Sequence, residues 1–68
     1  MKFEDFLYDV VEKLAKYRTL RVGQAVMTRL YEYNHSKYES ILGGEYDCFY
    51  SDYIVETTLK KLKEEWDD

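Results

Sequence analysis

The stretch Gly43-Gly44-Glu45-Tyr46-Asp47-Cys48-Phe49-Tyr50-Ser51-Asp52 separates two segments of helical pattern and sets the organisation of the chain. Its two glycines predict the end of the preceding helix, because glycine readily adopts the left-handed conformation of a helix C-terminus. A lone strand would have no pairing partner, so residues 45–50 are expected to form a loop. The stretch also carries three aromatic rings and three carboxylates.

Apolar residues at helical spacing predict helices on both sides of this loop. We expect helices over residues 3–16, 20–33 and 37–42 before the loop, and over residues 52–66 after it. The fold class that follows is all-α, a small compact bundle of three main helices plus one short helix, forming a single domain over residues 1–68. The stripes that carry this prediction are Phe3, Phe6, Leu7, Val10, Val11 and Leu14; Val22, Ala25, Val26, Arg29, Leu30 and Tyr33; and Val55, Leu59, Leu62 and Trp66.

Small polar residues suggest how these helices begin. Thr19 is a candidate cap for the second helix, and either Ser51 or Asp52 for the last one. Ser36 and Glu39 have the spacing of a capping box for the short third helix.

Two residues of the second helix have special conformational preferences. Gly23 lies inside it at a cost of about 1 kcal/mol relative to alanine, and we interpret it as permitting close packing against the first helix. Asn34 is a plausible C-terminal stop.

Size and charge narrow the classes of function. A chain of 68 residues has little room for a core together with a deep pocket that excludes water, which counts against a self-contained enzyme. The net charge is −4, so the chain lacks the excess of basic residues that is typical of nucleic-acid-binding proteins. An acidic protein favours a partner with a basic surface instead. We therefore expect no enzymatic activity and no cofactor.

Cysteine usage and hydropathy bear on location. The single cysteine cannot form an internal disulfide, which favours a reducing compartment, and we expect a cytoplasmic protein. The sequence has no apolar run long enough to span a bilayer, so no membrane association is expected. Glu4, Asp5 and Asp9 are unlike the start of a signal peptide.

Two groups of residues resemble metal ligands, and neither completes a site. Glu32, His35 and Glu39 have the spacing of one carboxylate–histidine arm, but the chain contains only one histidine, and we expect it in a solvated loop. The carboxylates of the loop do not match the calcium-loop pattern and are too few for a cation site. No metal site is predicted.

Cys48 and a basic junction carry the remaining chemical alternatives. A Cys48 nucleophile with a His35 base is conceivable, but a buried, structural cysteine explains the sequence better, so no catalytic residue is predicted. Lys16, Arg18 and Arg21 form a basic junction. This junction leaves open an alternative function, a small helix-turn-helix-like DNA-binding regulator that uses the second and third helices.

Several short motifs resemble a family of short uncharacterised bacterial and prophage-encoded proteins. The family pattern reads R-x-G-Q, then G-x-x-x-D-x-F-Y, then tryptophan, and the resemblance covers residues 20–66. It differs at Cys48, where relatives often have proline, and at Gly44, where they have threonine. The matching residues are Arg21-Val22-Gly23-Gln24, Leu30-Tyr31-Glu32, Tyr38, Ile41, Gly43, Tyr46-Asp47, Phe49-Tyr50 and Trp66.

The resemblance implies a phage or mobile-element setting and no established activity. Small acidic phage proteins often bind host proteins, so the leading functional hypothesis is a non-enzymatic protein-binding module. In its specific form, this module inhibits a host defence or nucleic-acid-handling protein, in the manner of an anti-CRISPR protein. A protein partner with a basic surface is expected, and nucleic acid is not.

The loop is the expected contact surface of this module. Phe49 is predicted to anchor it in the core, whereas Tyr46, Tyr50 and Tyr53 cannot all be buried with satisfied hydroxyls in so small a domain. At least one tyrosine should remain partly exposed beside carboxylates, an arrangement that suits a basic protein surface. The predicted partner-binding residues are Glu45, Tyr46, Asp47, Tyr50, Asp52 and Tyr53.

Overall fold

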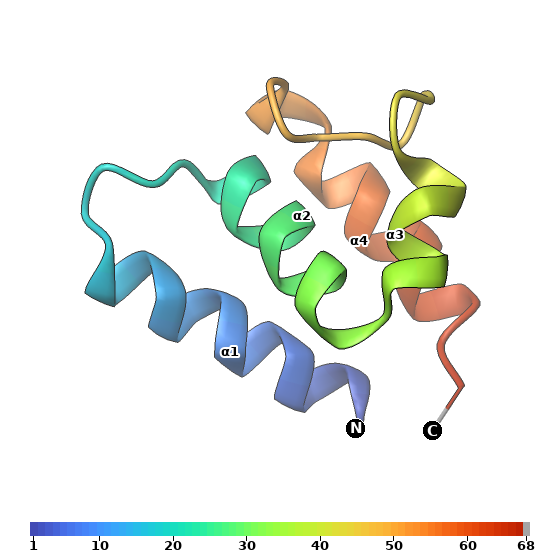
Figure 1. Cartoon of the computed structure of the whole chain (residues 1–68), viewed down its shortest axis with the longest axis horizontal. Coiled ribbons are helices and arrows are strands. Elements are labelled where there is room, and N and C mark those ends of the chain that lie inside the picture. Colours follow the sequence, from blue (N-terminus) through green and yellow to red (C-terminus); the bar gives the residue numbers. More distant parts are fainter. Residues whose placement is uncertain (68) are drawn as a thin grey trace.

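Helix α2 (Val22–Tyr33) is the centre of the fold (Figure 1). In the computed structural model, which describes residues 1–67, helices α1 (Phe3–Lys16) and α3 (His35–Ile41) both pack against it. After the loop, a short 3₁₀ turn η1 (Asp52–Ile54) leads into helix α4 (Val55–Glu64), and both also contact α2. The described part of the chain contains no strand, so the prediction of a small all-α bundle is confirmed.

The helix bounds follow the apolar periodicity closely. Helix α1 has the predicted bounds, and α2 begins two residues later than predicted. Helix α3 begins two residues earlier and ends one residue earlier than expected. The largest difference is at the last helix, where residues 52–54 form the 3₁₀ turn and the α-helix ends at Glu64.

Side chains from all four helices and from the loop fill the core. The loop contributes Cys48, which is fully buried. Val11 was expected in the apolar stripe of α1 but is 62% exposed, because it lies about 100° around the helix from buried Val10. Val22 is likewise exposed at the first turn of α2. The buried apolar residues are Phe3, Phe6, Val10, Ala25, Val26, Met27, Leu30, Ile41, Cys48 and Leu62.

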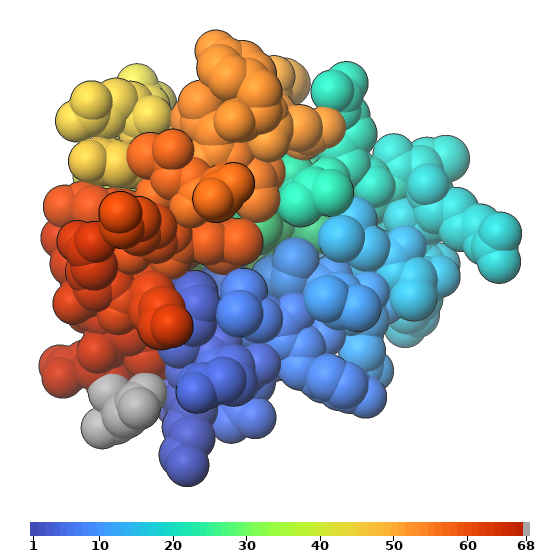
Figure 2. All heavy atoms as spheres, turned by 180° about the vertical axis from the view of Figure 1, so that it is seen from behind, coloured from blue at the N-terminus to red at the C-terminus, as the bar shows by residue number. Residues whose placement is uncertain are grey.

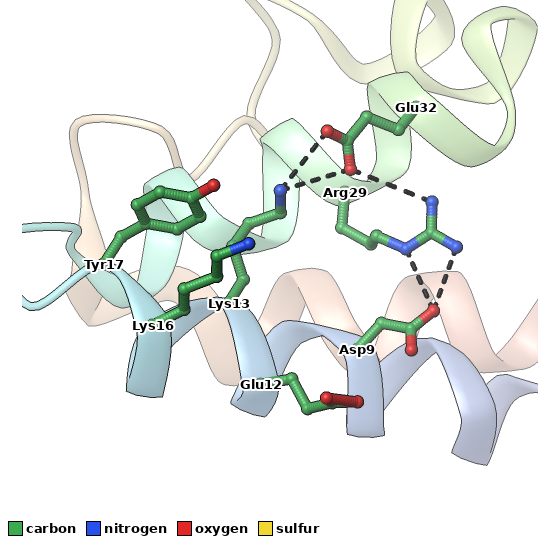
Figure 3. Close-up of a pocket in the computed structure, with 7 residues that line it drawn as sticks. All are labelled: Asp9, Glu12, Lys13, Lys16, Tyr17, Arg29 and Glu32. Atoms are coloured by element: carbon green, nitrogen blue, oxygen red, sulfur yellow. Dashed lines mark hydrogen bonds and ion pairs between the residues drawn. The ribbon is translucent and has the colours of Figure 1, made fainter.

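Ion pairs join α1 to α2 beside this core (Figure 3). Both Nε and Nη2 of Arg29 donate to Asp9 Oδ2, at 3.0 and 2.9 Å. One turn further along, Lys13 Nζ lies 3.2 Å from Glu32 Oε1. The sequence predicts Arg29 within the apolar stripe of α2, and the residue lies half-buried between the two helices, where its guanidinium pairs with Asp9.

The N-terminal residue and the segment after α4 lie close together (Figure 1). The indole Nε1 of Trp66 donates to the carbonyl oxygen of Met1 at 2.9 Å. The same indole packs against Phe3, Phe6 and Tyr33, with ring centroids 5.2, 5.0 and 5.5 Å apart. We call these four residues the terminal cluster. The cluster fixes the segment after α4 against α1 and the C-terminal end of α2.

The predicted cap of the third helix is wrong, and a different residue caps it. Asn34 ends α2 as predicted, but its Oδ1 also accepts from the backbone N–H of Lys37 at 3.0 Å. One asparagine therefore terminates one helix and begins the next. Ser36 lies inside the first turn of α3 and cannot act as its N-cap.

The other two predicted caps are also wrong. Helix α2 begins after Arg21, not Thr19, and the Gln24 side chain accepts from the Arg21 N–H at 3.0 Å. Helix α4 follows Ile54 without a side-chain cap, because η1 precedes it and the Asp52 carboxylate is engaged with α2. None of the described helices has the length and apolar character needed to cross a bilayer.

Candidate functional site

The loop between α3 and η1, residues 42–51, passes the N-terminal end of α2 (Figure 1). Side chains on the loop and on η1 attach this segment to the rest of the fold at several points. The attachments to α2 come from Cys48 and Asp52, and Asp47 holds the turn within the loop.

Asp52 caps α2 from outside that helix. Its Oδ1 accepts from the backbone N–H of Gly23 at 3.0 Å, and its Oδ2 accepts from Arg21 Nε at 2.8 Å. The first N–H groups of a helix have no partner within the helix, and its N-terminus favours a negative charge. The hydrogen bond from Arg21 and that from the Gly23 N–H lower the pKa of the Asp52 carboxyl below its usual value.

Gly23 allows the loop, and not α1, to approach α2 closely. A Cβ atom at this position would lie 1.8 Å from the carbonyl oxygen of Cys48, which is backbone and cannot swing aside. The interpretation that Gly23 permits close packing against the first helix is therefore wrong. Glycine is required because a carbonyl of the loop occupies the space of a side chain.

The Cys48 side chain lies at the same contact between the loop and α2, on the side of the core. Its Sγ is 3.7 Å from the carbonyl oxygen of Gly23, and the residue is fully buried, as the sequence predicts. Burial raises the pKa of the Cys48 thiol above its ordinary value. A raised pKa reduces the fraction of thiolate, which is the nucleophilic form, so this environment suits a packing role.

Asp47 fixes the turn itself. Its Oδ2 accepts from the N–H of Gly43 at 2.7 Å, and its Oδ1 accepts from the N–H of Phe49 at 3.0 Å. Gly43 has a φ of 75°, the left-handed conformation expected at the end of a helix. Nearby, Thr58 Oγ1 donates to the carbonyl oxygen of Tyr46 at 2.7 Å, which ties the loop to α4.

The aromatic side chains of the loop and η1 divide into packed and exposed rings. Phe49 is half-buried against the core, as predicted, and Tyr46 is half-buried with Lys61 Nζ 5.2 Å from its ring centroid. Tyr50 and Tyr53 are each 88% exposed, the highest exposure among the large hydrophobic residues of the described chain. The expectation of at least one exposed tyrosine is confirmed.

The six predicted contact residues therefore have different surroundings. Tyr50, Tyr53 and Glu45 are exposed, and Tyr46 is half-buried. Asp47 and Asp52 accept hydrogen bonds from the protein itself. The partner-binding role of all six stays a prediction.

A small cavity between α3 and the loop was not predicted from the sequence. It has a volume of about 230 Å³, and we call it the loop groove. Leu42, an apolar residue directly before the two glycines, is the one sequence signal of it. The residues that line the groove are Met27, Tyr38, Leu42, Asp47, Phe49 and Tyr50.

The histidine and the acidic residues do not form a metal site. His35 is the first residue of α3, not part of a loop, and its Nε2 lies 2.8 Å from Glu39 Oε1. Glu32 instead pairs with Lys13 on α1. Within residues 1–67, no three histidine, cysteine or acidic side chains are arranged to hold a metal ion.

The alternative function, a helix-turn-helix-like DNA-binding regulator, would use α2 and α3, which are joined by a single residue. Only Asn34 separates α2 from α3, whereas a helix-turn-helix has a turn of about three to four residues. Lys37 Nζ, the base on α3, donates to Glu65 Oε1 at 3.0 Å. This geometry gives the DNA-binding alternative no added support.

Comparisons of the chain with protein-family models, curated proteins and solved structures found no match.

Proposed function

We propose that this protein is a small non-enzymatic module that binds another protein through the exposed face of the loop and η1. The observation that carries the proposal is the combination of two highly exposed tyrosines, Tyr50 and Tyr53, with a backbone held by two aspartates. Tyrosine is enriched at protein interfaces because it offers a large contact area at a low cost in conformational entropy.

The attachment of the loop adds to the argument. Binding is weakened by the entropy lost when a flexible segment is ordered, and a segment that is already fixed avoids much of this loss. Asp47 bridges Gly43 and Phe49, and Asp52 bridges Arg21 and Gly23, on either side of Tyr50. Around η1, the orange segment projects from the upper edge of the molecule (Figure 2), where a partner has access to it.

The charge of this face favours a partner with a basic surface. Glu45 is exposed, and among residues 1–67 neither Glu45 nor Asp47 forms an ion pair. Unpaired carboxylates at the edge of an aromatic surface orient a cationic partner and raise its rate of association. The more specific proposal, inhibition of a host defence or nucleic-acid-handling protein, rests on the sequence resemblance to prophage-encoded proteins.

The proposal is tested by capturing a partner and then measuring affinity with purified proteins. The protein is immobilised, a host-cell protein that it retains is purified, and the pair is titrated by calorimetry. Tyr50→Ala combined with Tyr53→Ala is expected to weaken binding at least about tenfold, which corresponds to about 1.4 kcal/mol. The matched control combines Tyr8→Ala with Tyr17→Ala, two exposed tyrosines of the α1 side, and should keep wild-type affinity. Equal affinities for both double variants would refute this contact surface.

A further inference from the structure

The loop groove connects the core to the surface. Met27 on α2 is fully buried, whereas Leu42 is 52% exposed and Tyr50 is 88% exposed, and all three line the same cavity. The Phe49 ring meets the Tyr50 ring edge-on, with centroids 4.8 Å apart. An incoming apolar group would therefore meet an isobutyl group and aromatic rings, with the buried thioether of Met27 behind them, and this lining favours a large apolar side chain.

The size of the groove limits its occupant. A volume of about 230 Å³ is below the roughly 300–1,000 Å³ of typical small-molecule sites. A nucleotide or an organic cofactor exceeds this space, whereas one side chain of a neighbouring protein fits it.

The charge at the groove sets the chemistry of that neighbour. Asp47 lines the cavity and accepts one backbone hydrogen bond on each oxygen, from Gly43 and Phe49. A carboxylate has about four lone-pair sites, so Asp47 retains capacity for a further donor. Within residues 1–67 no cationic side chain pairs with Asp47, in contrast to Asp9 with Arg29 and Asp52 with Arg21.

We infer that the loop groove receives a large apolar side chain from a protein partner, beside a positively charged group of the same partner that pairs with Asp47. This inference rests on the proposed protein-binding function and deepens it, because it specifies the anchor that the partner presents. Tyr50 lies on the exposed face of the loop and η1 and also lines the loop groove. Tyr53 lies on that exposed face and does not line the groove.

Four small probes separate the contributions of the ring and of the charge. Phenylalanine amide carries a ring and a positive amine, N-acetylphenylalanine amide is neutral, N-acetylphenylalanine is negative, and glycine amide is positive without a ring. Each is titrated into the full chain labelled with ¹³C at its methionine methyl groups, and methyl resonances are followed by NMR. The chain has two methionines, so Met27 reports on the groove and Met1 on non-specific binding.

Phenylalanine amide is expected to shift the Met27 methyl resonance saturably while Met1 stays unchanged. Its dissociation constant should be about fivefold lower than that of the neutral probe, as an accessible ion pair allows. Glycine amide and the negative probe should produce no saturable shift. Equal binding of the neutral and positive probes, or equal shifts at Met1 and Met27, would overturn the inference.

Two lysine substitutions provide the matched controls. Leu42→Lys places an ammonium group at the groove, and Val11→Lys adds the same charge at another exposed position, on α1. The first variant is expected to abolish the Met27 shift and the second to retain it. Leu42→Ala, which changes no charge, is titrated in parallel and should weaken the shift. Retention of the wild-type shift in Leu42→Lys and Leu42→Ala would contradict the inference.

Other occupants of the groove give distinct results. If a second copy of this chain fills it, sedimentation will show a dimer that Leu42→Lys dissociates and Val11→Lys does not, which overturns the inference. Failure of the groove is also distinguishable from failure of the proposed function. If only the groove inference fails, Tyr53→Ala still weakens partner binding. If only the proposed function fails, Tyr53→Ala leaves partner binding unchanged, and the probes still bind this variant.

Discussion

Two groups of aromatic residues lie at opposite ends of α2, and they differ in what their rings contact. At the C-terminal end, the terminal cluster packs ring against ring, and the indole of Trp66 donates its N–H to the protein. Near the N-terminal end, the loop is fixed through its backbone while Tyr50 and Tyr53 extend into solvent. Aromatic residues in this small domain thus either stabilise the core through packed rings or present exposed rings from a fixed backbone.

This difference gives a general way to separate stabilising from binding residues. Where rings contact rings, truncation of a ring removes buried area and lowers stability. Where the backbone is fixed and the ring is free, truncation of the ring leaves the fold intact and removes only what the ring would contact. In this protein, the first rule applies to Trp66 and the second to Tyr53, whereas the Tyr50 ring is exposed but also meets the Phe49 ring.

The largest expected effect concerns the attachment of the loop. Gly23→Ala forces a methyl group to within 1.8 Å of the Cys48 carbonyl oxygen, so either α2 or the loop must move. We expect a loss of unfolding free energy on the order of 3 kcal/mol, measured by urea denaturation. The control is Gly44→Ala, whose nearest contact would be an ordinary 3.5 Å. A Gly23→Ala variant as stable as the control would show that the loop is not held against α2.

The next largest effect compares the two aromatic groups directly. Trp66→Ala removes a half-buried indole and its hydrogen bond to Met1, and we expect it to cost about 2 kcal/mol of unfolding free energy. Tyr53→Ala removes an exposed ring and should change stability by less than about 0.5 kcal/mol. Equal losses in the two variants would remove the distinction between the groups.

A smaller effect should appear as a pH dependence at Asp52. Its folded pKa lies below the unfolded value of about 3.9, so its ionised form stabilises the fold above that pH. This contribution is lost as the pH falls toward the folded pKa. Asp52→Asn keeps an acceptor for the Gly23 N–H but loses the ion pair with Arg21.

Urea midpoints of wild type and Asp52→Asn measured across pH should therefore follow a defined course. The wild-type midpoint is expected to be higher by a constant amount above about pH 5, and the difference should narrow below about pH 4. A difference that is independent of pH down to pH 2 would mean that the carboxylate charge does not contribute. Asp9→Asn, which alters the ion pair with Arg29 at a distance from the loop, is the matched comparison.

The helices were predictable because their apolar residues repeat with a local period. The bounds of α1 followed from an apolar stripe of which Phe3, Phe6 and Val10 are buried, since one face of that helix lies against the core. Helix caps were predicted poorly because cap preferences describe residues adjacent in sequence. The acceptor at the start of α2 comes from Asp52, twenty-nine positions after Gly23, and no local rule identifies such a pair.

The candidate site was predictable only in part. Three tyrosines in and beside the loop predicted an exposed ring, because so small a domain cannot bury them all, and Tyr50 and Tyr53 are the two that are exposed. The loop groove was not predictable, because it brings Met27 of α2 and Leu42 after α3 next to Phe49 of the loop. That juxtaposition depends on tertiary packing between residues far apart in the sequence, which local apolar patterns do not reveal.

The central claim is that Asp47 and Asp52 hold the backbone of the loop and η1 while Tyr50 and Tyr53 remain exposed. Amide hydrogen exchange of the native protein tests this claim most directly, at the N–H groups of Gly23 and Phe49 that donate to the two carboxylates. Both should exchange at least about a hundredfold more slowly than in an unstructured peptide, because exchange requires the Asp52 carboxylate to leave α2 in the first case and the turn held by Asp47 to open in the second. Exchange of the Phe49 N–H at the unstructured rate, with α1 still protected, would show a mobile loop and would contradict the account.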